Sequence, residues 1–230
     1  MSTGEAASSS YYHIRGVYQR IIRLTPQPTF VSGLPSSRKV ALVALFTALA
    51  AVLNILISVP DPGATFLFFE VWEIPILAVL LIMGIQGAAT VAVLNALVLE
   101  VVKPGALPTG PLYNLIAILS TFVGVLLAKR VTGSWKLGRK ILWISATVAG
   151  AFVRTLVMTL VNWIVLPLPY PIGFGSFGVT AAQVPPLLVP IGIFNFIVAS
   201  YSIPLAFSAY WALIARYKIL APSSFPGEAI

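Results

Sequence analysis

Long apolar runs, separated by short segments rich in proline, glycine or basic residues, limit most strongly what this chain can fold into. A helix needs about 20 predominantly apolar residues to cross a hydrocarbon layer about 30 Å thick. Six runs come near or exceed that length: 38–58, 71–85, 86–102, 111–128, 140–166 and 187–215. The second is short for a full crossing, so a short or tilted helix is expected there. The sequence therefore predicts an all-α integral membrane protein with six transmembrane helices.

The composition excludes the ordinary soluble enzymes. Of the 230 residues, 59% are hydrophobic and 9% are charged, whereas soluble domains average about 45–50% apolar and about 25% charged residues. One globule cannot bury this much apolar surface and still present a polar skin to water. A multi-pass protein of the cell membrane is expected instead.

Basic residues predict the orientation in the membrane. Six spans place both termini on one side, and twelve of the fourteen Lys and Arg residues fall on that side. They lie in the N-terminal tail, in the loop between the fourth and fifth runs, and after the last run. Because cytoplasmic loops are enriched in Lys and Arg, both termini are expected to be cytoplasmic. Topology thus explains the net charge of +8, and no nucleic-acid partner is required.

Three segments follow from this topology: a cytoplasmic N-terminal tail over 1–37, a six-helix membrane domain over 38–216, and a cytoplasmic C-terminal tail over 217–230. Within the first tail, residues 11–24 place apolar side chains at helical spacing with arginines between them. This pattern favours a short interfacial helix on an anionic leaflet. A basic flexible tail is the alternative.

Residue types that are scarce or absent exclude several kinds of chemistry. The chain has no cysteine, and its one histidine, His13, lies in the polar N-terminal tail. Thiolate metal sites, histidine zinc sites and Ser-His-Asp triads are therefore not expected, nor is any bound metal or cofactor. The segment from Gly133 to Lys140 resembles a P-loop but lacks Lys-Ser/Thr after its second glycine. No ATP-binding motif is recognised.

Polar side chains in the apolar runs gather toward the extracellular ends. Four acidic residues lie there, and so do three asparagines: Asp61, Glu70, Glu73, Glu100, Asn114, Asn162 and Asn195. Polar groups in hydrocarbon are unfavourable and usually mark a cavity or pathway. Their shared depth predicts an outward-facing pocket, and the uncharged, Pro- and Gly-rich segment 167–186 is expected to be an ordered loop or lid over it.

Arg154 is the one basic residue well inside a run, and it needs a partner because an unpaired arginine there is unfavourable. Counted along their helices, Arg154 and Glu100 lie at similar depths. An Arg154–Glu100 ion pair is therefore predicted. It would be either a structural interhelical pair or an anchor for a ligand.

Two further groups near the extracellular ends allow more than one interpretation. Glu70 and Glu73 are paired carboxylates that would perform acid–base chemistry, accept hydrogen bonds from a ligand, or cap a helix near Pro75. Three aromatic side chains would form an interfacial belt or stack on a flat heterocycle. These are Trp72, Trp163 and Tyr170.

Small residues form a stripe along the first run, at Ala41, Ala44, Ala48 and Ala51. Such spacing lets another helix approach closely. Packing within the chain and docking of a partner subunit are both compatible with it.

Several motifs resemble those of the substrate-binding S component of energy-coupling factor (ECF) vitamin transporters, most closely the riboflavin-specific branch. Residues 66–75, FLFFEVWEIP, are similar to the branch's F-L-x-x-D-x-x-D-I-P segment. Residues 110–114, GPLYN, are similar to its G-x-x-x-N motif. Asn162 followed by Pro and Tyr170, and Phe194-Asn195, are similar to its motifs on the last two spans. The resemblance covers roughly residues 39–216, with the motifs in order.

The resemblance implies a six-helix subunit that captures a vitamin from outside, riboflavin or a related flavin. It implies a transmembrane coupling protein and two cytoplasmic ATPases as partners, with the alanine stripe docking on the coupling protein. The residues that it implies for the vitamin site are Phe66, Leu67, Glu70, Trp72, Glu73, Asn114, Asn162, Trp163, Tyr170 and Asn195. Four positions depart from the branch: glutamates replace its two aspartates, while Phe68 and Val198 stand at its two lysine positions. These changes favour a reshaped pocket or a different vitamin.

Two other functions compete with this one. A stand-alone secondary transporter of a small metabolite would usually show internal repeats and ionisable residues at mid-membrane depth. No clear repeat is visible, and Arg154 and Glu100 are the candidates for such residues. An intramembrane enzyme is the least favoured, since the membrane runs lack histidine, cysteine and any metal-ligand cluster.

Overall fold

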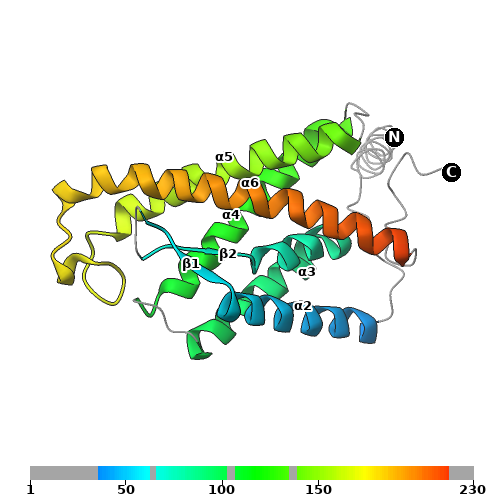
Figure 1. Cartoon of the computed structure of the whole chain (residues 1–230), viewed down its shortest axis with the longest axis horizontal. Coiled ribbons are helices and arrows are strands. Elements are labelled where there is room, and N and C mark those ends of the chain that lie inside the picture. The colour runs from blue at the N-terminus through cyan, green and yellow to red at the C-terminus, as the bar shows by residue number, and fades with distance from the viewer. Residues whose placement is uncertain (1–35, 63–65, 103–106, 135–138, 218–230) are drawn as a thin grey trace, which may run out of the picture.

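The computed structural model describes residues 36–62, 66–102, 107–134 and 139–217 (Figure 1). Five helices run through it: α2 Ser36–Leu56, α3 Glu73–Val102, α4 Gly110–Ser134, α5 Arg139–Val165 and α6 Val184–Arg216. Two short strands, β1 Ser58–Pro60 and β2 Phe68–Glu70, and two short 3₁₀ turns, η1 Gly175–Phe177 and η2 Ala181–Gln183, complete the elements. The expected interfacial helix over 11–24 lies outside the described residues.

Among the described residues, five helices are long and apolar enough to cross a membrane, one fewer than the six expected runs. The difference arises in α3, where Gly84 takes the non-helical angles φ 76° and ψ −170°. A positive φ of this kind is readily adopted only by glycine. The chain changes direction there, and the second segment turns back along the first (Figure 1). The first segment, 73–83, is only about 16 Å long at 1.5 Å per residue, roughly half a membrane crossing.

A β-hairpin leads into α3, which corrects the expectation of a purely helical chain. β1 and β2 pair antiparallel, with Ser58 opposite Glu70 and Pro60 opposite Phe68. The Asp61 N–H also donates to the Leu67 carbonyl oxygen at 2.8 Å. These bonds satisfy backbone groups that would otherwise be unpaired, which non-helical chain at membrane depth requires.

Small residues allow α4, α5 and α6 to pack closely. A Cβ added at Gly124 of α4 would lie 2.5 Å from the Ala149 carbonyl oxygen of α5. A Cβ added at the neighbouring Gly150 of α5 would lie 2.4 Å from Cδ1 of Ile203 on α6. Close approach through small residues is a common way for helices to associate within a membrane.

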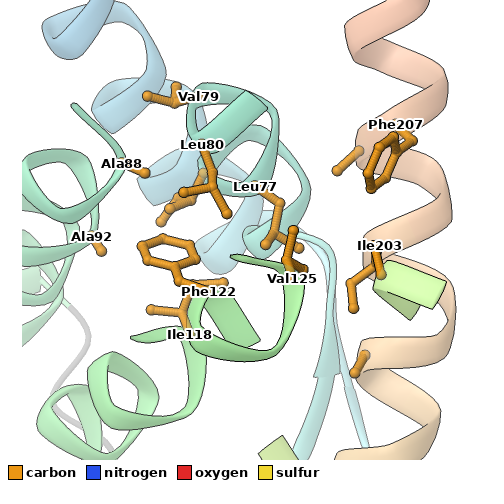
Figure 2. Packing of buried hydrophobic residues seen from close by; sticks show 14 of the residues in the cluster. Leu77, Val79, Leu80, Ala88, Ala92, Ile118, Phe122, Val125, Ile203 and Phe207 are labelled. Atoms are coloured by element: carbon orange, nitrogen blue, oxygen red, sulfur yellow. The ribbon is translucent and has the colours of Figure 1, made fainter. Parts of the chain in front are cut away.

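The apolar core lies where α3, α4 and α6 meet. Figure 2 shows Leu77 and Leu80 of α3 facing Phe122 and Val125 of α4, with Ile203 of α6 nearby. Large apolar side chains also cover the outside of the bundle. On α5, Val148, Phe152 and Leu156 follow one another at four-residue intervals and are 62%, 66% and 51% exposed. An apolar exterior of this kind suits contact with lipid.

Candidate functional site

Three buried polar side chains meet in the interior, and we call them the inner polar cluster: Glu73, Arg154 and Asn195. Arg154 lies eleven residues before Val165, where α5 ends, and Asn195 lies eleven residues after Val184, where α6 begins. Because α5 and α6 are antiparallel neighbours, these equal spacings place the two side chains at one level, about 16 Å from the connecting loop. The Arg154 Nε–H donates to Asn195 Oδ1 at 3.0 Å.

The third member reaches this level through the hairpin. Glu73 is the first residue of α3, and the chain before it runs inward as β2. The Arg154 Nη1–H donates to Glu73 Oε2 at 2.5 Å, which also forms an ion pair. The three residues are 2%, 3% and 2% exposed, in chain order. Asn195 Nδ2 donates in turn to the Ile191 carbonyl oxygen at 2.9 Å.

The expected Arg154–Glu100 ion pair is therefore wrong, because the partner is Glu73. Glu100 is exposed on α3, beside the buried Leu99. Equal depth along two helices does not make two side chains face each other, because the direction of each side chain depends on the helical phase. The requirement for a partner was correct, and Glu73 fulfils it.

A second buried carboxylate, Glu70, lies at the end of β2 and has several donors. Asn54 Nδ2, Ser58 Oγ and Trp72 Nε1 donate to its carboxylate at 3.3, 3.1 and 2.8 Å. The Tyr201 hydroxyl donates to its main-chain carbonyl oxygen at 2.6 Å. Glu70 therefore ties the hairpin to α2 and α6. It lies in a strand, so it does not cap a helix.

Aromatic and aliphatic side chains join the hairpin, the loop after α5 and α6, and we call them the apolar cover: Phe66, Leu67, Phe69, Phe174 and Phe194. The rings of Phe69 and Phe194 lie 4.9 Å apart, next in sequence to Glu70 and Asn195. Phe66 and Phe174 lie 5.2 Å apart and join the hairpin to the loop after α5. Leu67 packs with them on a small separate core. The cover thus brings the hairpin, the loop and α6 together.

The loop between α5 and α6 is ordered by hydrogen bonds from α4 and from the residue just before it. The Tyr113 hydroxyl donates to the Ile172 carbonyl oxygen at 2.5 Å, and Thr109 Oγ1 donates to the Pro171 carbonyl oxygen at 2.9 Å. Gly173 lies so close to the end of α5 that a Cβ there would be 1.9 Å from the Val165 carbonyl oxygen. The expectation of an ordered loop over 167–186 agrees with this arrangement, and its role as a lid stays a prediction.

Among the described residues, the remaining predicted site residues make no hydrogen bond to the inner polar cluster. Asn114 and Asn162 are half-buried, and Asn162 Nδ2 donates to the Met158 carbonyl oxygen of its own helix at 2.8 Å. Trp163 and Tyr170 are 58% and 51% exposed. Trp72 is buried, and its ring N–H is bonded to Glu70.

Sequence reasoning overlooked Asn54, Ser58 and Tyr201, which all hold Glu70. Asn54 is a polar side chain within an apolar run, which is the signal that could have revealed it. Ser58 and Tyr201 have no comparable signal, because the hairpin decides what they contact.

The alanine stripe lies mostly on the surface of α2. Ala41, Ala44 and Ala48 are exposed, whereas Ala51 is 7% exposed and packs inward. Docking of a partner on this stripe stays a prediction. Among the described residues, no three His, Cys, Asp or Glu side chains gather in a way that could hold a metal ion.

One solved structure has the same fold over most of this chain. It is described as the S component of a bacterial ECF transporter, with a TM-score of 0.65 and 22% sequence identity. The match covers 80% of this chain and 99% of the other. No protein-family model matches the chain, and no curated protein does. The shared fold and the five long apolar helices make this a multi-pass membrane protein.

Proposed function

We propose that this protein is the substrate-binding S component of an ECF transporter and that it captures a vitamin from outside the cell. The observation that supports this most is the shared fold, because the match spans nearly all of a solved S component. Glu73 and Asn195, which the sequence motifs assign to a ligand site, both bond to Arg154, and their meeting adds support.

A flavin, riboflavin first, is the proposed ligand. Isoalloxazine is a flat ring system with hydrogen-bonding groups along one edge. A site of aromatic side chains with a few buried polar groups suits such a molecule. The apolar cover and the inner polar cluster supply these two kinds of surface side by side. Val198 is buried and apolar where the riboflavin branch has a lysine, so Arg154 is the buried cation on this side of the bundle.

The contact between the hairpin segment and the loop after α5 suggests how the vitamin would enter and be enclosed. The segment that leads into β2 and the loop between α5 and α6 contact each other through Phe66 and Phe174. Separation of these two segments would admit the vitamin, and their closure would exclude water from it. A transmembrane coupling protein and two cytoplasmic ATPases would supply the energy, with the exposed alanines of α2 as the docking face.

Ligand binding by the purified, detergent-solubilised chain tests this proposal. We expect riboflavin to bind with quenching of its fluorescence, and Asn195→Ala to weaken binding at least tenfold, because Arg154 loses a hydrogen bond that orients it. Ser208→Ala is the matched control, since Ser208 is exposed on the same helix and bonds only to Pro204 of its own helix. If another vitamin binds instead, riboflavin is wrong but the class holds. If no vitamin binds, the proposed function is wrong.

The ion pair inside the membrane domain favours a second candidate, a stand-alone secondary transporter. Ionisable residues in membrane helices often mark the path of a coupling ion. Uptake by proteoliposomes that hold this protein alone, driven by a proton or sodium gradient, would support that function. Uptake that requires ATP and partner subunits would support the S component.

A further inference from the structure

Several hydrogen-bonding positions of the inner polar cluster remain unused. A guanidinium has five N–H groups, and Arg154 uses one on Nε and one on Nη1. Within the described residues, Arg154 Nη2 and Glu73 Oε1 have no hydrogen-bond partner, although both side chains are more than nine-tenths buried. Neither atom is fully enclosed, so each keeps some exposed surface from which it can bond to a ligand. Here a donor and an acceptor lie next to each other.

The charge of the cluster limits what can bind to it. An isolated arginine binds carboxylates and phosphates through paired hydrogen bonds. Arg154 is already neutralised by Glu73, and the carboxylate beside it repels anions. A second negative charge at this depth would be buried without a counter-charge, which is strongly unfavourable. The cluster therefore favours a neutral ligand.

We propose that Glu73 and Arg154 together bind the edge of a neutral ring that carries an N–H group beside a carbonyl group, as in a lactam or imide. The N–H of the ligand donates to Glu73 Oε1, and its carbonyl oxygen accepts from Arg154 Nη2. This inference rests on the proposed function and specifies how the ligand is recognised there. It also makes Glu73 and Arg154 the residues that discriminate between neutral and anionic compounds.

Asn195 has a different part in this arrangement. Its carbonyl oxygen accepts from Arg154 Nε, and its amide nitrogen donates to the Ile191 carbonyl oxygen. One lone pair of the amide oxygen and one hydrogen of the amide nitrogen are thus used by the protein. Asn195 is a positioning residue that fixes the plane of the guanidinium.

A ligand analogue tests the proposal without any mutation. Riboflavin has an imide N–H between two carbonyl groups, and 3-methylriboflavin replaces that hydrogen with a methyl group while keeping the charge and the ring. We expect the full-length protein to bind 3-methylriboflavin about tenfold to a hundredfold more weakly, because a buried acceptor loses its donor. Equal affinity for the two compounds would overturn this inference and leave the proposed function standing. If neither compound binds, flavin capture is wrong, and this inference falls with it.

Variants connect the discrimination to Glu73. Glu73→Gln is expected to reduce the ratio of the two affinities to about one, because Arg154 Nη1 holds the single carbonyl oxygen of Gln and leaves its NH2 group, a donor, facing the imide hydrogen. A ratio within one preparation is insensitive to the fraction of protein that is folded. Glu100→Gln is the matched control, since this exposed carboxylate on the same helix lies outside the cluster. If Glu73→Gln alone does not fold, the double variant Glu73→Leu/Arg154→Met removes both charges and the acceptor together and should show the same ratio. A wild-type ratio in either Glu73 variant would overturn the assignment.

Discussion

Burial of Arg154 is unfavourable, because its charged guanidinium is removed from water. Its stability in the fold depends on Glu73 for charge and on Asn195 for a further hydrogen bond. Such a pair contributes little compared with apolar residues of the same size, but breaking it by removing one partner is strongly destabilising.

Arg154→Met is therefore expected to lower the free energy of unfolding by about 3–5 kcal/mol, because the Glu73 carboxylate stays buried without its counter-charge. Thermal unfolding of the ligand-free protein in detergent measures the change. Arg216→Met is the control, since Arg216 is exposed at the end of α6. The double variant Arg154→Met/Glu73→Leu should regain most of the loss. A single variant as stable as the wild type would contradict the buried ion pair.

Depth could be predicted from the sequence at the residue scale, but contact could not. Counting residues along the helix placed Arg154 well inside the apolar run, and from that depth we inferred correctly that it needs a partner. The partner itself depends on the β-hairpin, which brings Glu73 inward, and on the helical phase, which turns Glu100 outward. Neither is visible in a hydropathy pattern.

Among the elements, the helices that cross the membrane fully were the easiest to predict. The run expected over 140–166 forms α5, Arg139–Val165, because a long apolar segment in lipid must satisfy its backbone internally. The hairpin was missed, since strands of three residues are too short to show an alternating pattern. The break between the second and third spans was expected near Gly84 and occurs there.

Close packing of α4 on α5 gives a prediction for these elements. Gly124→Ala is expected to destabilise the protein by about 1–3 kcal/mol, because its Cβ would lie 2.6 Å from the Gly150 Cα and the two backbones must separate. Gly110→Ala is the matched control, since an added Cβ at Gly110 meets no atom within 4 Å. Thermal unfolding of both variants in the same detergent compares them. Equal melting temperatures would show that α4 and α5 do not pack as described.

In the whole molecule, basic residues lie near one end of the helix bundle. α2 begins and α6 ends at one end of the bundle, where α4 also ends and α5 begins (Figure 1). Arg38, Lys39, Lys140 and Arg216 lie near that end in sequence, and Arg154 does not. The loop between α5 and α6 lies at the opposite end. The positive-inside rule therefore predicts that the first end faces the cytoplasm.

The absence of cysteine from the sequence makes this topology directly testable, because each introduced thiol is the only one in the chain. Ala182→Cys, exposed in the loop before α6, should react with a membrane-impermeant maleimide added to intact cells. Ser36→Cys, exposed at the start of α2, should react only after the cells are made permeable. The wild-type chain supplies the background. Labelling of Ser36→Cys in intact cells would place α2 in the reverse orientation, with the proposed vitamin site facing the cytoplasm, and would exclude capture from outside.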